Sequence, residues 1–322
     1  MKPVITLVYK GTSYEIPNRW NLLTPEQFLH LVEALQDFIQ GKIPPIMLRI
    51  RYVCDIMHWH IERIATDEEL LADLIAIAEQ VRFPLIIRYP DHEDLLDGLS
   101  DKDYNTCRRT DPFRNPLPIA QALQKVPYHY AVDLTFFAQL LPVVKIGDEV
   151  YKGYTASSSH GALTCSLTAL QYIDAYTFVG NAGALPLLAA ILYYPGVYNS
   201  EGAQHLADKF QQLPPATLAA ISMNFQAVCN FLYTRTPFSL LTKFQSKKAK
   251  SITTDSADAL YDLSADGLGN AEQVEQMNLL TYLRILRKKS IDAVKHLRAM
   301  DYDAGKIADE LGLPIDIINN II

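Results

Sequence analysis

The residue types in this sequence that could carry metal chemistry lie closest together at a pair of histidines. His58 and His60 flank Trp59, and Glu62 follows in the same stretch. Imidazole and carboxylate groups are common ligands of transition metals. We predict that this stretch is helical, and because positions two apart on a helix face different sides, the two histidines do not share an ion. His58 and Glu62 could share one, but two ligands do not complete a site, so a partly buried helix is the favoured interpretation.

Three further stretches hold acidic, nucleophilic or glycine residues, and each lacks the full pattern of a site. Residues 91–94 read DHED, which lacks EF-hand spacing, so we predict a solvated loop. Residues 157–161 read SSSHG, but adjacency does not make a catalytic triad, and a flexible connection is predicted. Residues 180–183 read GNAG, which is neither GxGxxG nor a P-loop and indicates a helix end and restart. We therefore predict a protein that is not an enzyme, with no catalytic residue, metal or cofactor.

The end of the sequence has the spacing of a helix-turn-helix, with Ile307, Leu313 and Ile318 as apolar positions around Gly312. A DNA reader of this type needs Arg, Lys, Asn or Gln on its second helix. Residues 314–322 read PIDIINNII and hold no positive charge. The basic residues lie upstream, at Arg284, Arg287, Lys288, Lys289, Lys295 and Arg298. We favour a small docking bundle, and DNA binding is the alternative.

Length, charge and cysteine usage limit the class of protein. With 322 residues the chain can form two domains, each with its own core. A net charge of −7 argues against a dedicated nucleic-acid binder, which carries a basic face. The cysteines lie far apart, which is typical of a reducing compartment. No signal peptide is evident, and the most apolar run, residues 182–194, is shorter than the ~20 residues of a membrane span, so we predict a cytoplasmic protein without membrane binding.

Two segments of the sequence resemble each other. Both begin with VYKG, at Val8 and at Val150, and both enter a helix through Leu-Thr-x-x-Gln, at Gln27 and Gln171. Alternating residues predict a β-hairpin before each helix. A second similarity links residues 121–141 with 209–232, where a helix, a hydrophobic-Pro break and a longer helix are predicted. We favour a duplicated unit of β-hairpin followed by a helical bundle, and chance similarity between two α-rich domains is the alternative.

The predicted fold class is therefore mainly α (α+β), with a small C-terminal helical module. The first hairpin-plus-helices unit spans residues 1–142, and an insertion at about 61–115 holds a short strand and a long loop at 91–115. Helices are predicted at 118–125 and 128–141. The second, shorter copy of the unit spans 143–242. Residues 243–270, rich in Lys, Ser, Thr, Asp and Gly, have the composition of a flexible linker.

Residues 271–322 form the predicted C-terminal docking module. One helix over 271–299 and two short ones have little core of their own, and exposed apolar surface on so small a module favours binding to a partner. We predict that the module binds another protein subunit or a second copy of the chain. The residues predicted to carry this contact are Leu283, Leu286, Ile315, Ile318 and Ile321.

The layout of residues 1–240, in which hairpins lead into LTxxQ helices and residues 213–232 read LPPATLAAISMNFQAVCNFL, carries a family resemblance. It resembles uncharacterised bacteriophage and prophage structural or tail-assembly proteins of gut Bacteroidetes. The resemblance implies a virion component or assembly chaperone that binds phage structural proteins, in the host cytoplasm or in the virion. A nucleic-acid-associated regulator is the alternative, and an enzyme whose residues converge only in three dimensions is a third possibility.

Overall fold

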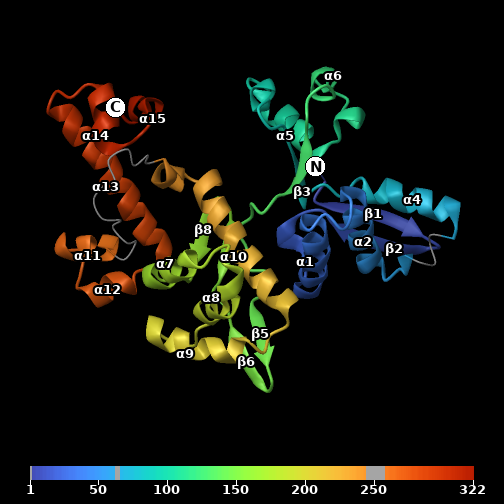
Figure 1. The fold of residues 1–322 in the computed structure, drawn as a ribbon, viewed down its shortest axis with the longest axis horizontal. Coiled ribbons are helices and arrows are strands. Elements are labelled where there is room, and N and C mark those ends of the chain that lie inside the picture. The colour runs from blue at the N-terminus through green and yellow to red at the C-terminus, as the bar shows by residue number, and fades with distance from the viewer. Residues whose placement is uncertain (1, 62–65, 244–257) are drawn as a thin grey trace. The chain divides into compact units, whose positions relative to one another are not determined.

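The computed structural model describes residues 2–61, 66–243 and 258–322. Helices make up most of these residues, and the strands pair in two-stranded antiparallel sheets (Figure 1). The mainly α (α+β) class is therefore confirmed. The chain divides into two compact units, Met1–Leu134 and Thr135–Ile322.

The first unit begins with a β-hairpin and a helix whose start is fixed by side-chain hydrogen bonds. β1 (Val4–Tyr9) pairs antiparallel with β2 (Thr12–Pro17). After a 3₁₀ turn, η1 (Trp20–Leu22), helix α1 (Pro25–Ile39) starts at a capping box. The Gln27 amide donates to Thr24 Oγ1, and the Thr24 amide donates to Gln27 Oε1. The predicted hairpin and the predicted helix start are confirmed.

Helices α2 (Pro45–Met57) and α4 (Glu68–Ala78) enclose an aromatic core in this unit. The Trp20 and Tyr52 rings lie edge-on to Phe83, with ring centroids 5.0 and 5.5 Å away. Trp20 Nε1 also donates to the carbonyl of Asp133 at 2.9 Å. Edge-to-face aromatic packing stabilises such a core beyond the burial of area alone.

The expected insertion has a core of its own and more structure than its sequence indicates. β3 (Leu85–Arg88), the predicted strand, pairs with β4 (His129–Val132). The elements between them are η2 (Glu93–Leu96), α5 (Asp101–Arg109), η3 (Pro112–Arg114) and α6 (Ala120–Leu123). The buried side chains of this part are Ile87, Tyr89, Leu96, Cys107 and Leu123. The predicted loop at 91–115 and the predicted helix at 128–141 are therefore wrong, the latter because β-pairing with β3 competes successfully with helical periodicity.

The second unit opens with consecutive hairpins. β5 (Val143–Ile146) pairs with β6 (Glu149–Lys152), as predicted. β7 (Ala156–Ser159) pairs with β8 (Ala162–Cys165), where a flexible connection was expected. His160 and Gly161 both have positive φ, the geometry that a two-residue hairpin turn requires.

The second unit is helical after its hairpins, as predicted. Its helices are α7 (Ala169–Thr177), α8 (Leu185–Leu192), α9 (Ser200–Phe210) and α10 (Pro215–Arg235), with the short turns η4 (Ala182–Ala184) and η5 (Pro237–Thr242). Buried Asn224 on α10 accepts from the Leu140 amide and donates to the Ala138 carbonyl, each at 2.7 Å. This contact joins residues 138–140 to the second unit. The two units divide between Leu134 and Thr135, whereas the predicted boundary lay between residues 142 and 143.

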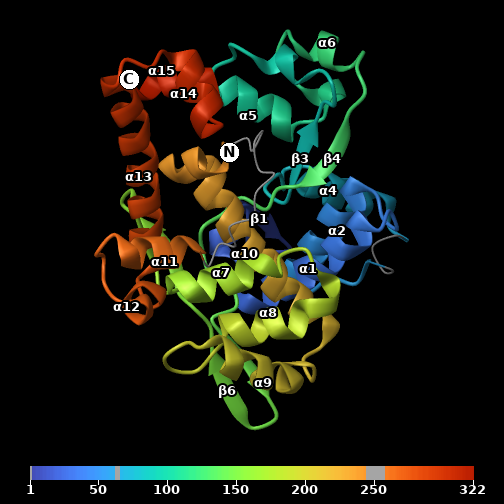
Figure 2. The ribbon, with the colours of Figure 1, turned by 60° about the vertical axis from the view of Figure 1, so that its left-hand side comes forward.

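The C-terminal helices belong to the second unit. α11 (Asp258–Ala265) and α12 (Ala271–Glu275) lie near the N-terminal end of α13 (Leu279–Ala299), and α14 (Ala304–Leu311) and α15 (Ile315–Ile321) lie at its other end (Figures 1 and 2). The predicted linker differs from the structure over α11, whose Leu260 and Leu263 are buried. Its residues 244–257 lie outside the described residues. The predicted helix 271–299 is interrupted before Asn278, which caps α13.

The chain after α12 is hydrogen-bonded to the start of α7. The Ala169 amide donates to the Met277 carbonyl, and the Leu279 amide donates to the Leu167 carbonyl. Asn278 Nδ2 donates to the Cys165 carbonyl at 2.6 Å. Residues 271–322 are therefore not a detached module, because backbone pairing joins α13 to the helical part of the second unit.

The predicted duplication is not confirmed, because the shared tetrapeptide occupies different places. Lys10 and Gly11 form the turn of the first hairpin, whereas Val150 and Lys152 lie within β6. A Cβ at Gly153 would lie 2.8 Å from the Tyr193 ring, so that glycine permits close packing instead of a turn. The extra β7–β8 hairpin and the absence of a helix at 128–141 remove further support. The Leu-Thr-x-x-Gln motifs do mark equivalent helix starts, since Thr24 and Thr168 are both N-caps.

A membrane-spanning role was not expected from the sequence. Within the described ranges, none of the helices combines the length and the apolar character that crossing a bilayer demands.

Candidate functional site

The predicted protein-binding residues fall into a buried group and an exposed one. Leu283 and Ile318 are 1% and 0% exposed, Leu286 and Ile321 are half-buried, and Ile315 is 51% exposed. The buried cluster that holds Ile318 consists of Leu240, Val294, Ile307, Leu313 and Ile318. Leu283 and Ile318 therefore stabilise the fold and do not form a binding surface. The sequence prediction missed this because η5, more than 40 positions upstream, supplies part of the core.

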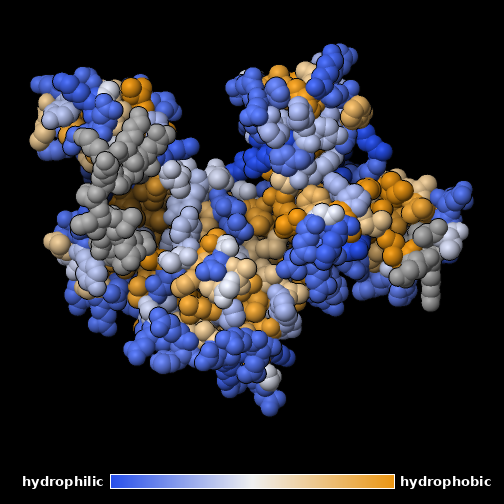
Figure 3. Space-filling model, viewed as in Figure 1, coloured by the Kyte–Doolittle hydropathy of each residue, from blue (hydrophilic) through white to orange (hydrophobic). Residues whose placement is uncertain are grey.

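Large apolar side chains remain outside this closed core. Met300 and Tyr302 in the turn after α13 are 54% and 38% exposed, and Ile315 and Ile322 on and after α15 are 51% and 54% exposed. Figure 3 shows hydrophobic residues between hydrophilic ones at this end of the chain. These four residues, the outer C-terminal residues, are the exposed apolar positions that a partner protein could cover.

The same helices carry exposed positive charge. Among the basic residues of α13, Lys289 forms an ion pair with Asp266. The other exposed cations on this helix are Arg284, Lys288, Lys295 and Arg298. The predicted helix-turn-helix spacing is present as α14, a left-handed Gly312 and α15, but the first turn of α15 holds Asp316. The charge is thus on the helix that precedes the motif and not on its second helix.

The histidine pair does not lie on a helix as predicted. α2 ends at Met57, and His58 adopts a left-handed conformation that terminates it. His58 and His60 instead line one pocket together with His30 and Asp55. Burial raises the pKa of the Asp55 carboxyl. Within residues 2–61, 66–243 and 258–322, no group of three or more His, Cys, Asp or Glu residues could hold a metal ion.

The other sequence candidates have structural contacts. Glu93 of the acidic stretch forms an ion pair with Arg108 at 2.5 Å and accepts from the Tyr89 amide. Ser157 Oγ lies 2.7 Å from Thr164 Oγ1, across the β7–β8 hairpin whose turn contains His160. Asn181 caps the η4 turn between α7 and α8, as the GNAG stretch predicts. None of these arrangements places a nucleophile beside a base.

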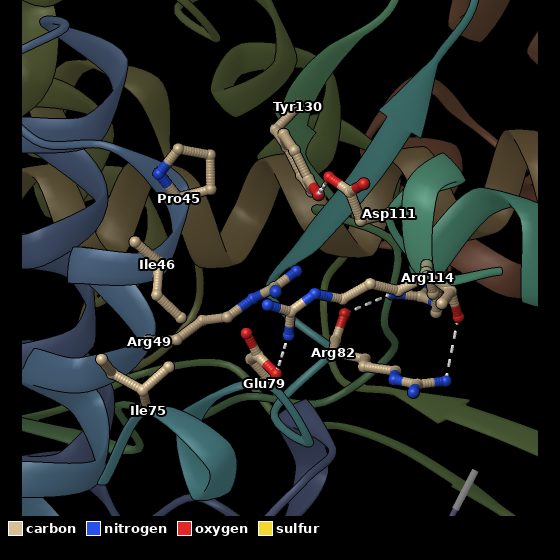
Figure 4. Close-up of a pocket in the computed structure, with 11 residues that line it drawn as sticks. Pro45, Ile46, Arg49, Ile75, Glu79, Arg82, Asp111, Arg114 and Tyr130 are labelled. Atoms are coloured by element: carbon tan, nitrogen blue, oxygen red, sulfur yellow. Dashed lines mark hydrogen bonds and ion pairs between the residues drawn. The ribbon is translucent and has the colours of Figure 1, made fainter. Parts of the chain in front are cut away.

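A pocket that the sequence did not predict lies in the first unit and is rich in arginine. Its volume is about 530 Å³, and α2, the end of α4, the segment around η3 and β4 form its walls. The charged residues that line it are Arg49, Glu79, Arg82, Arg109, Asp111 and Arg114. In Figure 4 the Arg49 and Arg114 side chains extend into the pocket from opposite walls.

Most of these arginines have partners. Arg109 forms an ion pair with Asp133 and donates to the carbonyls of Arg82, Phe83 and Leu85. Arg114 forms an ion pair with Glu79. Arg82 Nη1 donates to Thr110 Oγ1 at 3.0 Å, so its hydrogen bond is to a neutral group. Two of the arginines are thus charge-paired, and Arg82 is not.

Arg49, like Arg82, forms no ion pair within the described residues, but unlike Arg82 it is buried. It is only 8% exposed, and its Nε is buried without a hydrogen-bond partner. Its guanidinium stacks against the Tyr130 ring, 5.6 Å from the centroid. Burial is the largest influence and lowers the pKa of this guanidinium. Arg82 also lowers the pKa, whereas Tyr130, Glu79 and Asp111 raise it. A buried cation in this state is costly unless something pairs with it.

Asp111 is the remaining carboxylate in the wall. Its Oδ2 accepts from the hydroxyls of Tyr130 at 2.8 Å and Tyr128 at 3.3 Å, and its Oδ1 accepts from the Phe113 amide. Burial and the bond to Asp111 raise the pKa of Tyr130, so that hydroxyl keeps its proton and remains a donor. Asp111 therefore accepts hydrogen bonds from three neutral donors and forms no ion pair within the described residues.

The sequence does hold one signal for this pocket. Arg49 lies between Leu48 and Ile50 and precedes Tyr52 and Val53 at helical spacing, so a charged residue occupies the buried face of α2. The other arginines lie 33 to 65 positions further along the sequence, and only folding brings them together.

Comparisons with known proteins add no relative. No family model matches the chain, and neither a curated protein nor a solved structure matches it.

Proposed function

We propose that this chain is a non-enzymatic protein that acts by binding other protein subunits through the outer C-terminal residues. The observation that carries the proposal is the exposure of Ile315 and Ile322 beside a core that is already closed around Ile318. Exposed apolar side chains that form a contiguous patch mark a surface that a partner can cover. The occupant we propose is another subunit of the same assembly.

The assembly is proposed to be a phage or phage-tail-like particle, with the chain as virion component or assembly chaperone. The support is the resemblance of residues 1–240 to phage and prophage structural proteins. The two-stranded sheets are compatible with this role, because unpaired strand edges accept strands from other chains. Genes for tail-tube, tape-measure or portal proteins next to the coding gene would support the particle, and a neighbourhood of metabolic genes would contradict it.

Nucleic-acid binding is the second candidate, and a specific observation favours it. Arg284, Lys288, Lys295 and Arg298 are exposed on α13, directly before the helix-turn-helix spacing. Phosphate contacts from such residues would give an affinity that falls steeply with salt. An apolar protein contact has no such dependence.

Ile315→Asp in the full-length chain tests the proposal. We expect it to weaken association with the partner subunit, or self-association, by at least about tenfold, because a charge would replace an apolar contact. Sedimentation velocity of the purified chain, alone and mixed with candidate subunits, measures this. Since Ile315 is half exposed, the melting temperature should stay close to that of the parent chain.

The matched control replaces Lys288 and Lys289 with Ala, which removes positive charge and leaves Ile315 in place. The protein-binding proposal predicts little change in association and little change between about 50 and 200 mM salt. The chain could instead retard duplex DNA in a gel-shift assay, with an affinity that falls with salt and is lost in the lysine variant. That result would replace the protein-binding proposal with the regulator proposal.

A further inference from the structure

The Arg49 pocket lacks one negative charge. Arg109 and Arg114 are paired with Asp133 and Glu79, so their charges are balanced. The charges left in the wall are those of Arg49, Arg82 and Asp111. Two guanidinium groups and one carboxylate leave a net charge of about +1 in a partly enclosed space, where charges interact more strongly than in water.

The pocket also has an apolar side. Pro45, Ile46 and Ile75 line it from α2 and α4, and the Tyr130 ring lies beside Arg49. Figure 4 shows Pro45, Ile46 and Ile75 on the wall from which Arg49 extends. The volume of about 530 Å³ is far more than a bare inorganic anion fills and lies within the roughly 300–1,000 Å³ of small-molecule sites.

We propose that this pocket binds a small organic carboxylate, with its carboxylate on the Arg49 guanidinium and its apolar body against Pro45, Ile46 and Ile75. A guanidinium offers parallel N–H donors that match the two oxygens of a carboxylate. The ligand supplies the partner that the buried Arg49 lacks, and its single negative charge balances the wall.

The charge of the wall distinguishes a carboxylate from a phosphate. A phosphate dianion would leave an excess negative charge beside the Asp111 carboxylate, whose oxygens already accept from the Tyr128 and Tyr130 hydroxyls and the Phe113 amide. Like charges at close range in a partly buried site repel. Inorganic phosphate should therefore bind more weakly than a carboxylate that carries an apolar chain.

Isothermal titration calorimetry of the full-length chain at constant ionic strength tests the proposal with hexanoate and benzoate as probes. We expect one binding site per chain. The neutral analogues hexanamide and benzamide test the charge, acetate tests the apolar body, and inorganic phosphate tests the anion class. Each of these should bind at least about tenfold more weakly than hexanoate, since each lacks one of the two contacts or carries the wrong charge.

Arg49→Met keeps the length of the side chain and removes the charge, so hexanoate affinity should fall by about 10- to 100-fold. Arg51→Met is the matched control, because Arg51 lies on the same helix but pairs with Asp37 outside the pocket. That variant should bind hexanoate as the parent does. Arg49→Lys keeps a charge without the paired donors and should give an intermediate affinity.

Thermal melting separates binding from folding. If Arg49 is kept for a ligand, Arg49→Met should raise the melting temperature of the free chain, because it removes an unpaired buried charge. If Arg49→Met lowers the melting temperature, the hexanoate affinity of the Arg49→Lys variant tests the binding proposal. The proposal is overturned if neither probe binds, if phosphate binds more tightly than both, or if folded Arg49 variants bind hexanoate as well as the parent.

Discussion

Single buried polar side chains join segments that lie far apart in this sequence. Asn224 holds residues 138–140 against α10 through both its amide nitrogen and its oxygen. Asn18 does the same in the first unit, donating to the carbonyl of Gln80 and accepting from the amide of Arg82. Each replaces a backbone partner that an irregular segment lacks, and an unpaired backbone group would be costly in a core.

Asn224→Ala should lower the free energy of unfolding of the second unit by about 2–4 kcal/mol. The change leaves the Leu140 amide and the Ala138 carbonyl without a partner, and each buried unsatisfied group costs ~1–3 kcal/mol. Chemical denaturation of the full chain measures the loss.

Asn319→Ala is the matched control, because Asn319 is exposed on α15. We expect its effect to stay within about 0.5 kcal/mol. Equal effects of the two substitutions would mean that residues 138–140 are not held by α10.

Arg49 illustrates the opposite case, a buried guanidinium whose Nε has no hydrogen-bond partner inside the described chain. A charged residue on the buried face of α2 can be read from the sequence, as can the apolar residues around it. The sequence does not show that the Arg49 Nε lacks a hydrogen-bond partner. That property depends on which acceptors Arg82, Arg109 and Arg114 bind in the folded chain.

At the scale of elements, local signals predicted helix starts and hairpins well. Thr24 and Thr168 cap their helices as the motif indicates, because an N-cap hydrogen bond depends only on residues within one turn. The predicted helix at 128–141 is wrong because β4 pairs with β3, from which residues 89–128 separate it. Hydrophobic periodicity within a segment cannot reveal a partner strand that lies so far away in the sequence.

The same limit applies to α13. Its apolar stripe was predicted correctly, but the elements that cover it, α7 and η5, come from earlier in the chain. The apolar stripe of α13 was therefore interpreted as a free surface. Leu279, Leu280 and Leu283 are instead buried within the second unit.

Leu283→Ala should destabilise the second unit by about 2–5 kcal/mol, as expected for a leucine that is fully buried. Leu286→Ala, three positions along the same helix and only half-buried, should cost about 1 kcal/mol. Denaturant unfolding of the full chain compares the two. Small and equal losses would show that α13 is a detachable docking helix after all.

At the scale of the whole molecule, the sequence predicted units at 1–142 and 143–242, a linker at 243–270 and a C-terminal module at 271–322, whereas the structure divides into two compact units, Met1–Leu134 and Thr135–Ile322. It did not show that the C-terminal helices belong to the second unit. Backbone hydrogen bonds from Met277 and Leu279 to the residues around Thr168 carry this connection, and backbone pairing leaves no trace in residue types. The internal similarity was misleading, because VYKG performs different roles in its two positions.

A consequence concerns how the chain meets other proteins. With Leu283 and Ile318 committed to the core, a partner can contact only side chains that the C-terminal helices leave exposed. Of the residues predicted from the sequence, Ile315 is the one that is more than half exposed. The central claim is that this position touches another protein subunit.

Site-specific photo-crosslinking in the full-length chain tests that claim most directly. A photoreactive amino acid in place of Ile315, introduced into the chain in its native assembly, should give a discrete crosslinked band that contains a second protein subunit. The same group in place of Glu201, whose side chain is 89% exposed on α9, should give no such band. If position 315 crosslinks to no protein, or crosslinks to nucleic acid instead, the account of this chain as a protein-binding assembly component is contradicted.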